Sequence, residues 1–191
     1  AKLAKDVLSV YYRTKDRNKM RAPQVTVSVS CFIPKPFTPF QWEAQDTLEA
    51  LSEKQAYLKE CITDRRIRYT YHDAKVSRLE AVFARGDRRL APVIEEAVRN
   101  GAKLDGWDEY FKHDAWIKAF ETCGVDPEFY TTRGYGEDEL LAWDHINVGL
   151  RKDFLLRDRH TAYENRITPD CRHKCAGCGA NCLLKEAKCD A

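Results

Sequence analysis

One strand that runs directly into a proline-rich loop constrains the fold of this chain most. Residues 25–33, VTVSVSCFI, alternate apolar with small polar side chains, which predicts a half-buried β-strand. Residues 34–42, PKPFTPFQW, follow at once and contain three prolines. Because proline lacks a backbone donor and fixes φ, we expect these residues to form an extended loop that carries aromatic side chains, rather than a helix or a central strand.

Helical signals dominate the rest of the chain. Asp46, followed three residues later by Glu49, predicts a helix over 46–63. The alternating residues 67–71, IRYTY, predict a second strand. The same cap and periodicity rules predict a short helix before the first strand, packed on the sheet, and helices from Asp73 to Gly86 and from Asp87 to Gly101. Further helices are expected over 108–123 and 150–163, with another helix start at Asp126. Between them we expect a loop over 134–143 and a short strand or turn over 144–149.

The balance of elements excludes some complete architectures. Two or three strands stand against about six helices, too few for a whole parallel α/β barrel or a doubly wound sheet. The expected class is therefore helix-rich α/β, with part of a larger sheet missing. The chain begins at Ala1 and holds a single methionine, so we expect it to be a segment of a longer protein.

Charge and hydropathy exclude other classes. The chain has 32 Lys and Arg against 30 Asp and Glu, a formal net charge of +2, unlike a dedicated nucleic-acid binder. No apolar run approaches the roughly 20 residues of a membrane span, and the N-terminus lacks the pattern of a signal peptide. We expect a cytoplasmic protein with no membrane partner.

Five of the eight cysteines lie in the last 21 residues. Cys171, Cys175, Cys178 and Cys182 form a C-x3-C-x2-C pattern followed by a further cysteine, with glycines between them. Thiolates crowded on one short loop are typical of a 4Fe-4S cluster. Zinc is the alternative, although its sites usually pair two separated knuckles. The scattered cysteines are expected to be small core residues: Cys31, Cys61 and Cys123.

Two polar groups are open to either a functional or a structural interpretation. Arg85, Arg88 and Arg89 could bind a phosphate or carboxylate, or form ion pairs with neighbours such as Glu80 and Glu95. Asp144 and His145 could form an acid–base pair, but adjacent side chains often point apart, which favours a structural role.

Several segments in a fixed order resemble one enzyme family. They are VSVSCFIPKPFTPFQWEAQD, FARGDRRL, DGWDEYF, WDHINVG and TPDCRHKCAGCG. Together they resemble the C-terminal part of the radical SAM enzymes of an uncharacterised bacterial family with an N-terminal cobalamin (B12)-binding-type domain. The resemblance runs from about residue 25 to residue 179 and so covers nearly the whole chain.

The resemblance implies a division of labour along the chain. Residues 1–42 would be the C-terminal end of a radical SAM partial barrel, 43–165 a helical extension with one or two short strands, and 166–191 a Cys-rich cluster-binding tail. The parent enzyme would cleave S-adenosylmethionine reductively to start radical chemistry, with cobalamin as a further cofactor. The partner of this chain would be the remainder of the parent polypeptide, which acts on an unidentified small-molecule or RNA substrate.

The proline-rich loop is the expected substrate side of this segment. It leaves the carboxyl end of a strand, where ligands gather in parallel α/β sheets, and it offers Lys35, Thr38 and Gln41 as polar contacts. The alternative is that its aromatic residues only staple the barrel to the next helix.

The chain departs from a complete family member in lacking upstream barrel strands and a first cluster motif. The radical SAM signature is itself C-x3-C-x2-C, but few residues follow Cys178, whereas a catalytic cluster must be followed by its barrel. The tail is therefore expected to hold an auxiliary 4Fe-4S cluster, and the chain alone to be inactive. The alternative from another class is a non-catalytic helical module with a zinc-knuckle tail that binds RNA through Arg85, Arg88 and Arg89.

Overall fold

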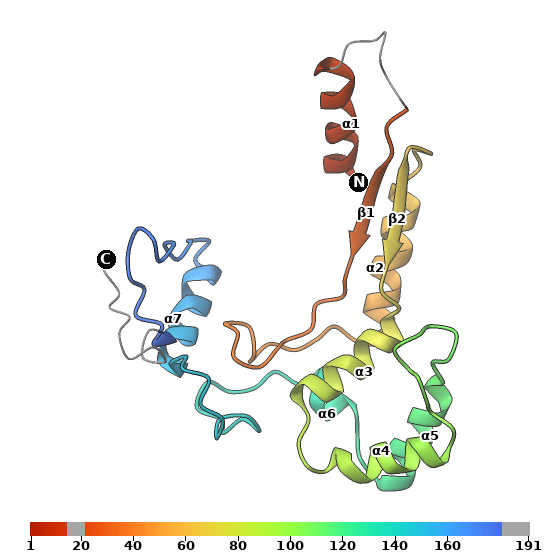
Figure 1. Cartoon of the computed structure of the whole chain (residues 1–191), viewed down its shortest axis with the longest axis vertical. Helices are drawn as coiled ribbons and strands as arrows, with labels where there is room; N and C mark the ends of the chain where they lie inside the picture. The colour runs from red at the N-terminus through yellow and green to blue at the C-terminus, as the bar shows by residue number, and fades with distance from the viewer. Residues whose placement is uncertain (15–21, 181–191) are drawn as a thin grey trace. The chain divides into compact units, whose positions relative to one another are not determined.

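The computed structural model describes residues 1–14 and 22–180. Within these ranges the chain forms seven helices and one two-stranded parallel sheet, which confirms a helix-rich α/β class (Figure 1). The chain contacts divide it into two compact units: the first takes residues 1–32 and 46–79, and the second takes 33–45 and 80–191. The first unit therefore combines residues from both sides of residue 42, the expected end of the barrel segment.

The first unit is built on a parallel strand pair. β1 (Val25–Val29) pairs with β2 (Ile67–Tyr71) in a register that places Val27 opposite Tyr69. Parallel strands need a long crossover, and α2 (Leu48–Cys61) lies within it. The half-buried face of β1 follows the predicted alternation, but the strand ends at Val29, so Cys31 lies beyond it.

The N-terminal helix covers this sheet, as predicted. α1 (Lys2–Thr14) buries Ala4 and Leu8 against Ile67 of β2, with Val25 and Val27 of β1 packed around them. At the start of α2 the capping group differs from the prediction. Thr47 accepts the Ala50 N–H at 3.2 Å, whereas Asp46 pairs with Lys54. The helix cap therefore lies one residue later than predicted, because the Thr47 hydroxyl is available next to the Asp46 carboxylate.

The helices that follow begin and end close to the predicted signals. Asp73 accepts the Lys75 and Val76 N–H groups at the start of α3 (Ala74–Arg85), and α4 (Leu90–Arg99) ends before Gly101. α5 (His113–Cys123) ends at Gly124, whose φ of 62° suits a left-handed cap, but it begins five residues later than expected. The remaining helices are α6 (Glu128–Thr131) and α7 (Lys152–Tyr163).

The proline-rich loop folds as consecutive turns rather than as an extended segment. The Gln41 N–H donates to the Thr38 carbonyl at 3.1 Å, and the Gln41 side-chain oxygen accepts the Phe37 N–H at 2.9 Å. Prolines exclude ladder hydrogen bonds but leave these local ones, so the loop can close on itself. Its last residue, Trp42, is 1% exposed and packs with Leu141, Trp143 and Leu155 in the core of the second unit.

Side chains far apart in the sequence hold this core together. Arg159 of α7 donates to Glu43 at 2.7 Å, and Tyr163 of α7 meets Phe40 edge to face. Residues 144–149 form no strand: they continue a turn at Asp144 and His145 and then run as bends and irregular backbone, which is closer to the predicted turn. None of the helices in the described residues is long and apolar enough to cross a membrane.

Candidate functional site

The three loop residues expected to face a substrate occupy different environments. Gln41 is 2% exposed, and its side-chain oxygen also accepts the Trp143 indole N–H at 2.7 Å. Lys35 pairs with Glu80, and the Thr38 hydroxyl donates to the Lys35 carbonyl at 2.7 Å. Gln41 is thus a core residue, which leaves Lys35 and Thr38 as the polar groups of this loop that solvent can reach.

The same loop lines a pocket through residues that the sequence did not single out. Pro36 and Phe37 line a pocket of about 620 Å³, together with Gly86, Arg88 and His145. Phe37 has a φ of 59°, an uncommon conformation for a residue with a side chain, which costs energy and is found at functional sites more often than elsewhere. Pro36 and Phe37 are therefore the loop residues that line this pocket, and Phe37 also packs against the core around Trp42.

The cysteine tail is described as far as residue 180. Cys171 is exposed, Cys175 and Cys178 are half-buried, and none of the three forms a disulfide within the described residues. Cys182 lies outside the described residues. Within the described part of the chain, no three His, Cys, Asp or Glu side chains converge as a set of metal ligands.

Local geometry around Cys175 nevertheless fits a thiolate ligand loop. The Gly177 N–H donates to the Cys175 Sγ at 3.4 Å, and Gly177 and Gly179 have φ values of 69° and 93°. N–H groups aimed at sulfur stabilise thiolates, and positive φ lets the backbone curl around an ion. The backbone N–H of Arg151 fixes the loop, because it donates to the Cys178 carbonyl at 2.9 Å.

Basic side chains surround this part of the tail. A pocket of about 470 Å³ is lined by Cys175, Arg157, Arg166 and Lys174, with Asp158 as its carboxylate. The Arg157 guanidinium also donates to the Ala176 carbonyl at 3.3 Å.

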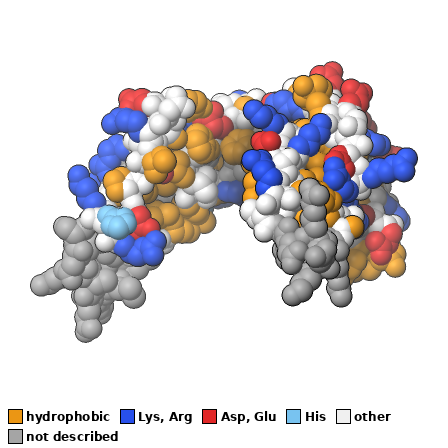
Figure 2. Space-filling view, turned by 90° about the horizontal axis from the view of Figure 1, so that it is seen from above, with side chains coloured by type: hydrophobic (Ala, Val, Ile, Leu, Met, Phe, Trp, Pro, Cys, Tyr) orange, Lys and Arg blue, Asp and Glu red, His pale blue; other side chains and the backbone are white. Residues whose placement is uncertain are grey.

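Of the arginines of the FARGDRRL segment, Arg89 forms an ion pair with a neighbouring carboxylate, and Arg85 is buried against backbone carbonyls. Arg85 is 1% exposed and donates to the carbonyls of Thr131 and Arg133 at 3.1 and 2.9 Å. Arg89 pairs with Asp87 at 2.7 Å rather than with Glu95. Burial leaves Arg85 unable to contact an RNA backbone in this conformation, so only the exposed Arg88 and Arg89 could do so. Lys and Arg lie among acidic and apolar side chains on the face shown in Figure 2.

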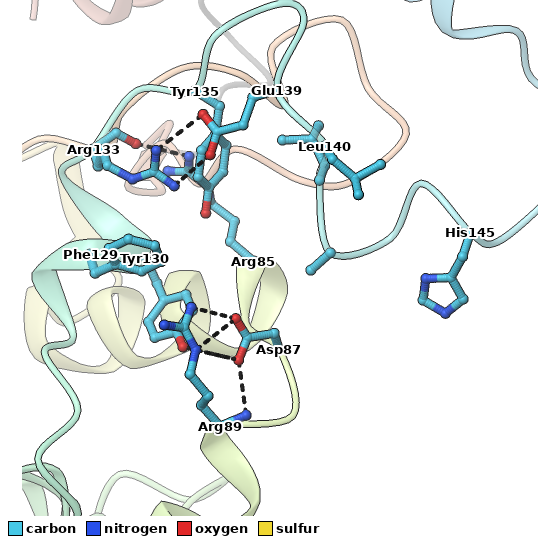
Figure 3. A pocket seen from close by; sticks show the side chains of 12 residues that line it. Arg85, Asp87, Arg89, Phe129, Tyr130, Arg133, Tyr135, Glu139, Leu140 and His145 are labelled. Carbon is cyan, nitrogen blue, oxygen red and sulfur yellow. Dashed lines mark hydrogen bonds and ion pairs between the residues drawn. The ribbon is translucent and has the colours of Figure 1, made fainter.

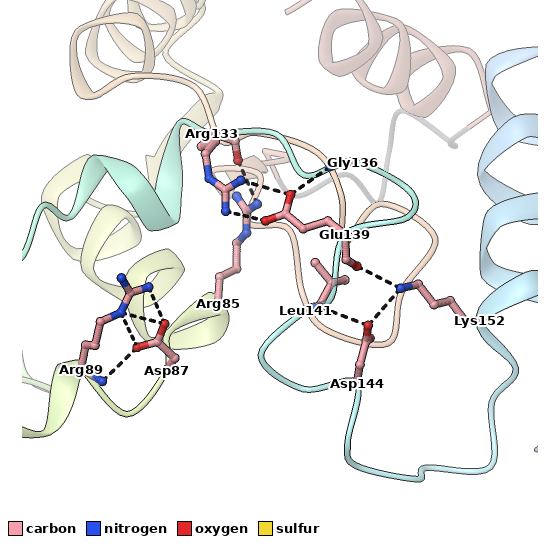
Figure 4. A network of polar contacts seen from close by, with 9 residues as sticks. All are labelled: Arg85, Asp87, Arg89, Arg133, Gly136, Glu139, Leu141, Asp144 and Lys152. Atoms are coloured by element: carbon pink, nitrogen blue, oxygen red, sulfur yellow. Dashed lines mark hydrogen bonds and ion pairs between the residues drawn. The ribbon is translucent and has the colours of Figure 1, made fainter.

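A polar network joins Arg85 to the following loop through the Arg133 carbonyl, while Arg89 and Asp87 form a separate pair (Figure 4). Arg133 donates to both carboxylate oxygens of Glu139, at 3.1 and 2.9 Å. Lys152 of α7 donates to the Glu139 carbonyl at 3.2 Å and to Asp144 at 2.9 Å. Asp144 is therefore a structural residue, while His145 beside it lines pockets, as expected if the two side chains point apart.

The carboxylates of this region are held in their charged form. Hydrogen bonds from Arg89 lower the pKa of Asp87 to about 2, and hydrogen bonds from Arg133 lower the pKa of Glu139. Burial lowers the pKa of Arg85. Sequence reasoning missed Arg133, Tyr135 and Glu139, because nothing in their local pattern indicates which earlier residues they meet.

Comparison with known proteins adds no assignment. The chain matches no protein-family model, no curated protein and no solved structure.

Proposed function

We propose that this chain is the C-terminal segment of a radical SAM enzyme, whose parent cleaves S-adenosylmethionine reductively to start radical chemistry. The ordered motifs described above support this, and so does one structural observation that carries the proposal. β1 and β2 are parallel and joined through α2, which is the repeating unit of an α/β barrel. If β1 belongs to the barrel, its hydrogen-bonded neighbour β2 belongs to it too, so the barrel segment extends to Tyr71 rather than ending at residue 42.

The proline-rich loop is the proposed substrate side of this segment. It follows the carboxyl end of β1, the end at which parallel sheets bind ligands. Pro36 and Phe37 line a pocket, and Lys35 and Thr38 are the loop's accessible polar groups. The buried Gln41 would position the loop rather than touch a ligand.

The tail is proposed to hold an auxiliary 4Fe-4S cluster. Cys171, Cys175 and Cys178 would be ligands, with Cys182 as the fourth. The donor set fits, because thiolates are the ligands of such clusters and a backbone N–H already points at the Cys175 sulfur. Arg157 and Lys174 would offset the negative charge of the thiolates. Such a cluster supplies electron transfer when bound.

Anaerobic reconstitution with iron and sulfide tests the tail. The chain should gain broad visible absorption, and Cys171→Ala, Cys175→Ala and Cys178→Ala should each abolish it. Cys123→Ala is the matched control, since Cys123 ends α5 and lies outside the cysteine motif of the tail. The reconstituted Cys123→Ala variant should absorb as strongly as the wild-type chain. Stoichiometric zinc without iron, after expression in iron-replete cells, would instead support the zinc-knuckle module.

A further inference from the structure

A third pocket in the second unit is lined by more positive than negative groups. It measures about 340 Å³ and lies between the end of α3 and residues 129–145 (Figure 3). Three arginines and two carboxylates form its charged lining: Arg85, Arg89, Arg133, Asp87 and Glu139. Both carboxylates are occupied by ion pairs, so one guanidinium charge remains in excess.

Aromatic rings hold the three guanidinium groups in place. The Arg89 guanidinium carbon lies 4.9 Å from the Phe129 ring centroid, and that of Arg133 lies 4.4 Å from the same ring. Arg133 also lies 4.3 Å from the Tyr135 ring, over which Arg85 lies at 4.0 Å. The order Arg89, Phe129, Arg133, Tyr135, Arg85 is thus a continuous series of cation–π contacts.

This arrangement leaves hydrogen-bonding capacity unused. The Nε–H groups of Arg85 and Arg133 are buried and make no hydrogen bond. These two donors face the neighbouring rings and not the open part of the pocket, so contacts with a ligand would come from the terminal guanidinium nitrogens. The Arg89 side chain, by contrast, is 57% exposed, so the donors that it does not use on Asp87 are open to solvent.

The lining also limits the size and character of a ligand. About 340 Å³ is at the small end of the range for small-molecule sites. Leu140, Leu141 and Ala142 give one wall an apolar surface, and His145 stands beside them. Guanidinium groups fixed by stacking lose little freedom when they bind a planar or tetrahedral oxyanion in bidentate fashion.

We propose that this pocket binds a small molecule through a phosphate or carboxylate group, with Arg89 and Arg133 as its principal contacts and the apolar wall at residues 140–142 against the remainder of the ligand. Arg85 is buried behind these two side chains, so it would contribute positive charge to the pocket without contacting the anion. This inference concerns the second unit alone and does not depend on the proposed function or on the metal in the tail.

Titration of the 191-residue chain with inorganic phosphate, and separately with succinate, tests the proposal. Isothermal calorimetry at constant ionic strength, with chloride as the balancing anion, should show saturable one-site binding of at least one of them. The two arms distinguish a phosphate site from a carboxylate site. Arg89→Gln should weaken binding roughly tenfold or more, because it removes a charge-assisted contact.

Arg99→Gln is the matched control, since Arg99 is an exposed arginine of α4 that pairs with Glu95 and does not line the pocket. It should leave the affinity unchanged. A second readout needs no variant: the ¹⁵N-labelled Nε resonances of Arg89 and Arg133 should shift on titration. Absence of saturable binding by both anions, or equal affinity of wild type and Arg89→Gln, would overturn the proposal.

Discussion

Replacement of Gln41 by methionine removes one acceptor and leaves the volume of the side chain almost unchanged. That oxygen accepts the Phe37 N–H at 2.9 Å and the Trp143 indole N–H at 2.7 Å, and Gln41 is 2% exposed. Each unsatisfied buried donor costs about 1–3 kcal/mol. The free energy of unfolding of the second unit should therefore fall by roughly 2–6 kcal/mol.

Urea unfolding followed by tryptophan fluorescence measures this loss, and hydrogen exchange of the Trp143 indole N–H reports it locally. The indole proton should exchange faster in Gln41→Met. Gln24→Met is the control, because Gln24 is exposed and should change stability by less than about 0.5 kcal/mol. A loss below that threshold in Gln41→Met, with unchanged indole exchange, would refute the claim that Gln41 fastens the loop to the core.

Three further predictions concern packing, pH and activity. Gly86→Ala should lower the free energy of unfolding in urea by about 1–3 kcal/mol, because a Cβ would lie 2.8 Å from the Val82 carbonyl oxygen. Gly106→Ala, which has open space around it, should be neutral. Equal effects of the two substitutions would contradict the close packing at Gly86. Asp87 has a folded pKa of about 2, below the ordinary 3.8, so its contribution to stability is present above pH 4 and is lost as the pH falls toward 2. Asp87→Asn should flatten that part of the profile of stability against pH. An unchanged profile would contradict the assignment. The reconstituted chain incubated with S-adenosylmethionine and dithionite should release no 5′-deoxyadenosine above a cluster-free control; turnover would show that the tail cysteines form the catalytic cluster.

Local signals predicted the elements well, because their causes lie within a few residues. Alternation gave the bounds of β2, the Asp73 carboxylate begins α3, and Gly124 ends α5 through its positive φ. The capping of α2 by Thr47 instead of Asp46 shows the limit of such rules when two acceptors are adjacent.

The candidate sites depended on contacts that no local pattern encodes. Gln41 meets Trp143, which lies 102 residues away, and this contact turned an expected substrate-facing side chain into a core one. Arg85 similarly meets Thr131 and Arg133 across more than 40 residues, so the pocket they form was invisible in the FARGDRRL segment alone. Tertiary contacts of this kind decide whether a polar residue can contact a ligand or only stabilises the fold.

The proposal of a radical SAM segment rests on the parallel strand pair and the cysteine pattern of the tail, and its most direct test is whether the tail binds a metal. Native mass spectrometry of the chain, purified and sprayed without oxygen, counts the metal and sulfide atoms bound to each molecule. We expect a mass increment of four iron and four sulfide atoms that Cys175→Ala lacks and Cys123→Ala retains. A single zinc atom in the wild-type chain, removed by the same Cys175→Ala substitution, would contradict it.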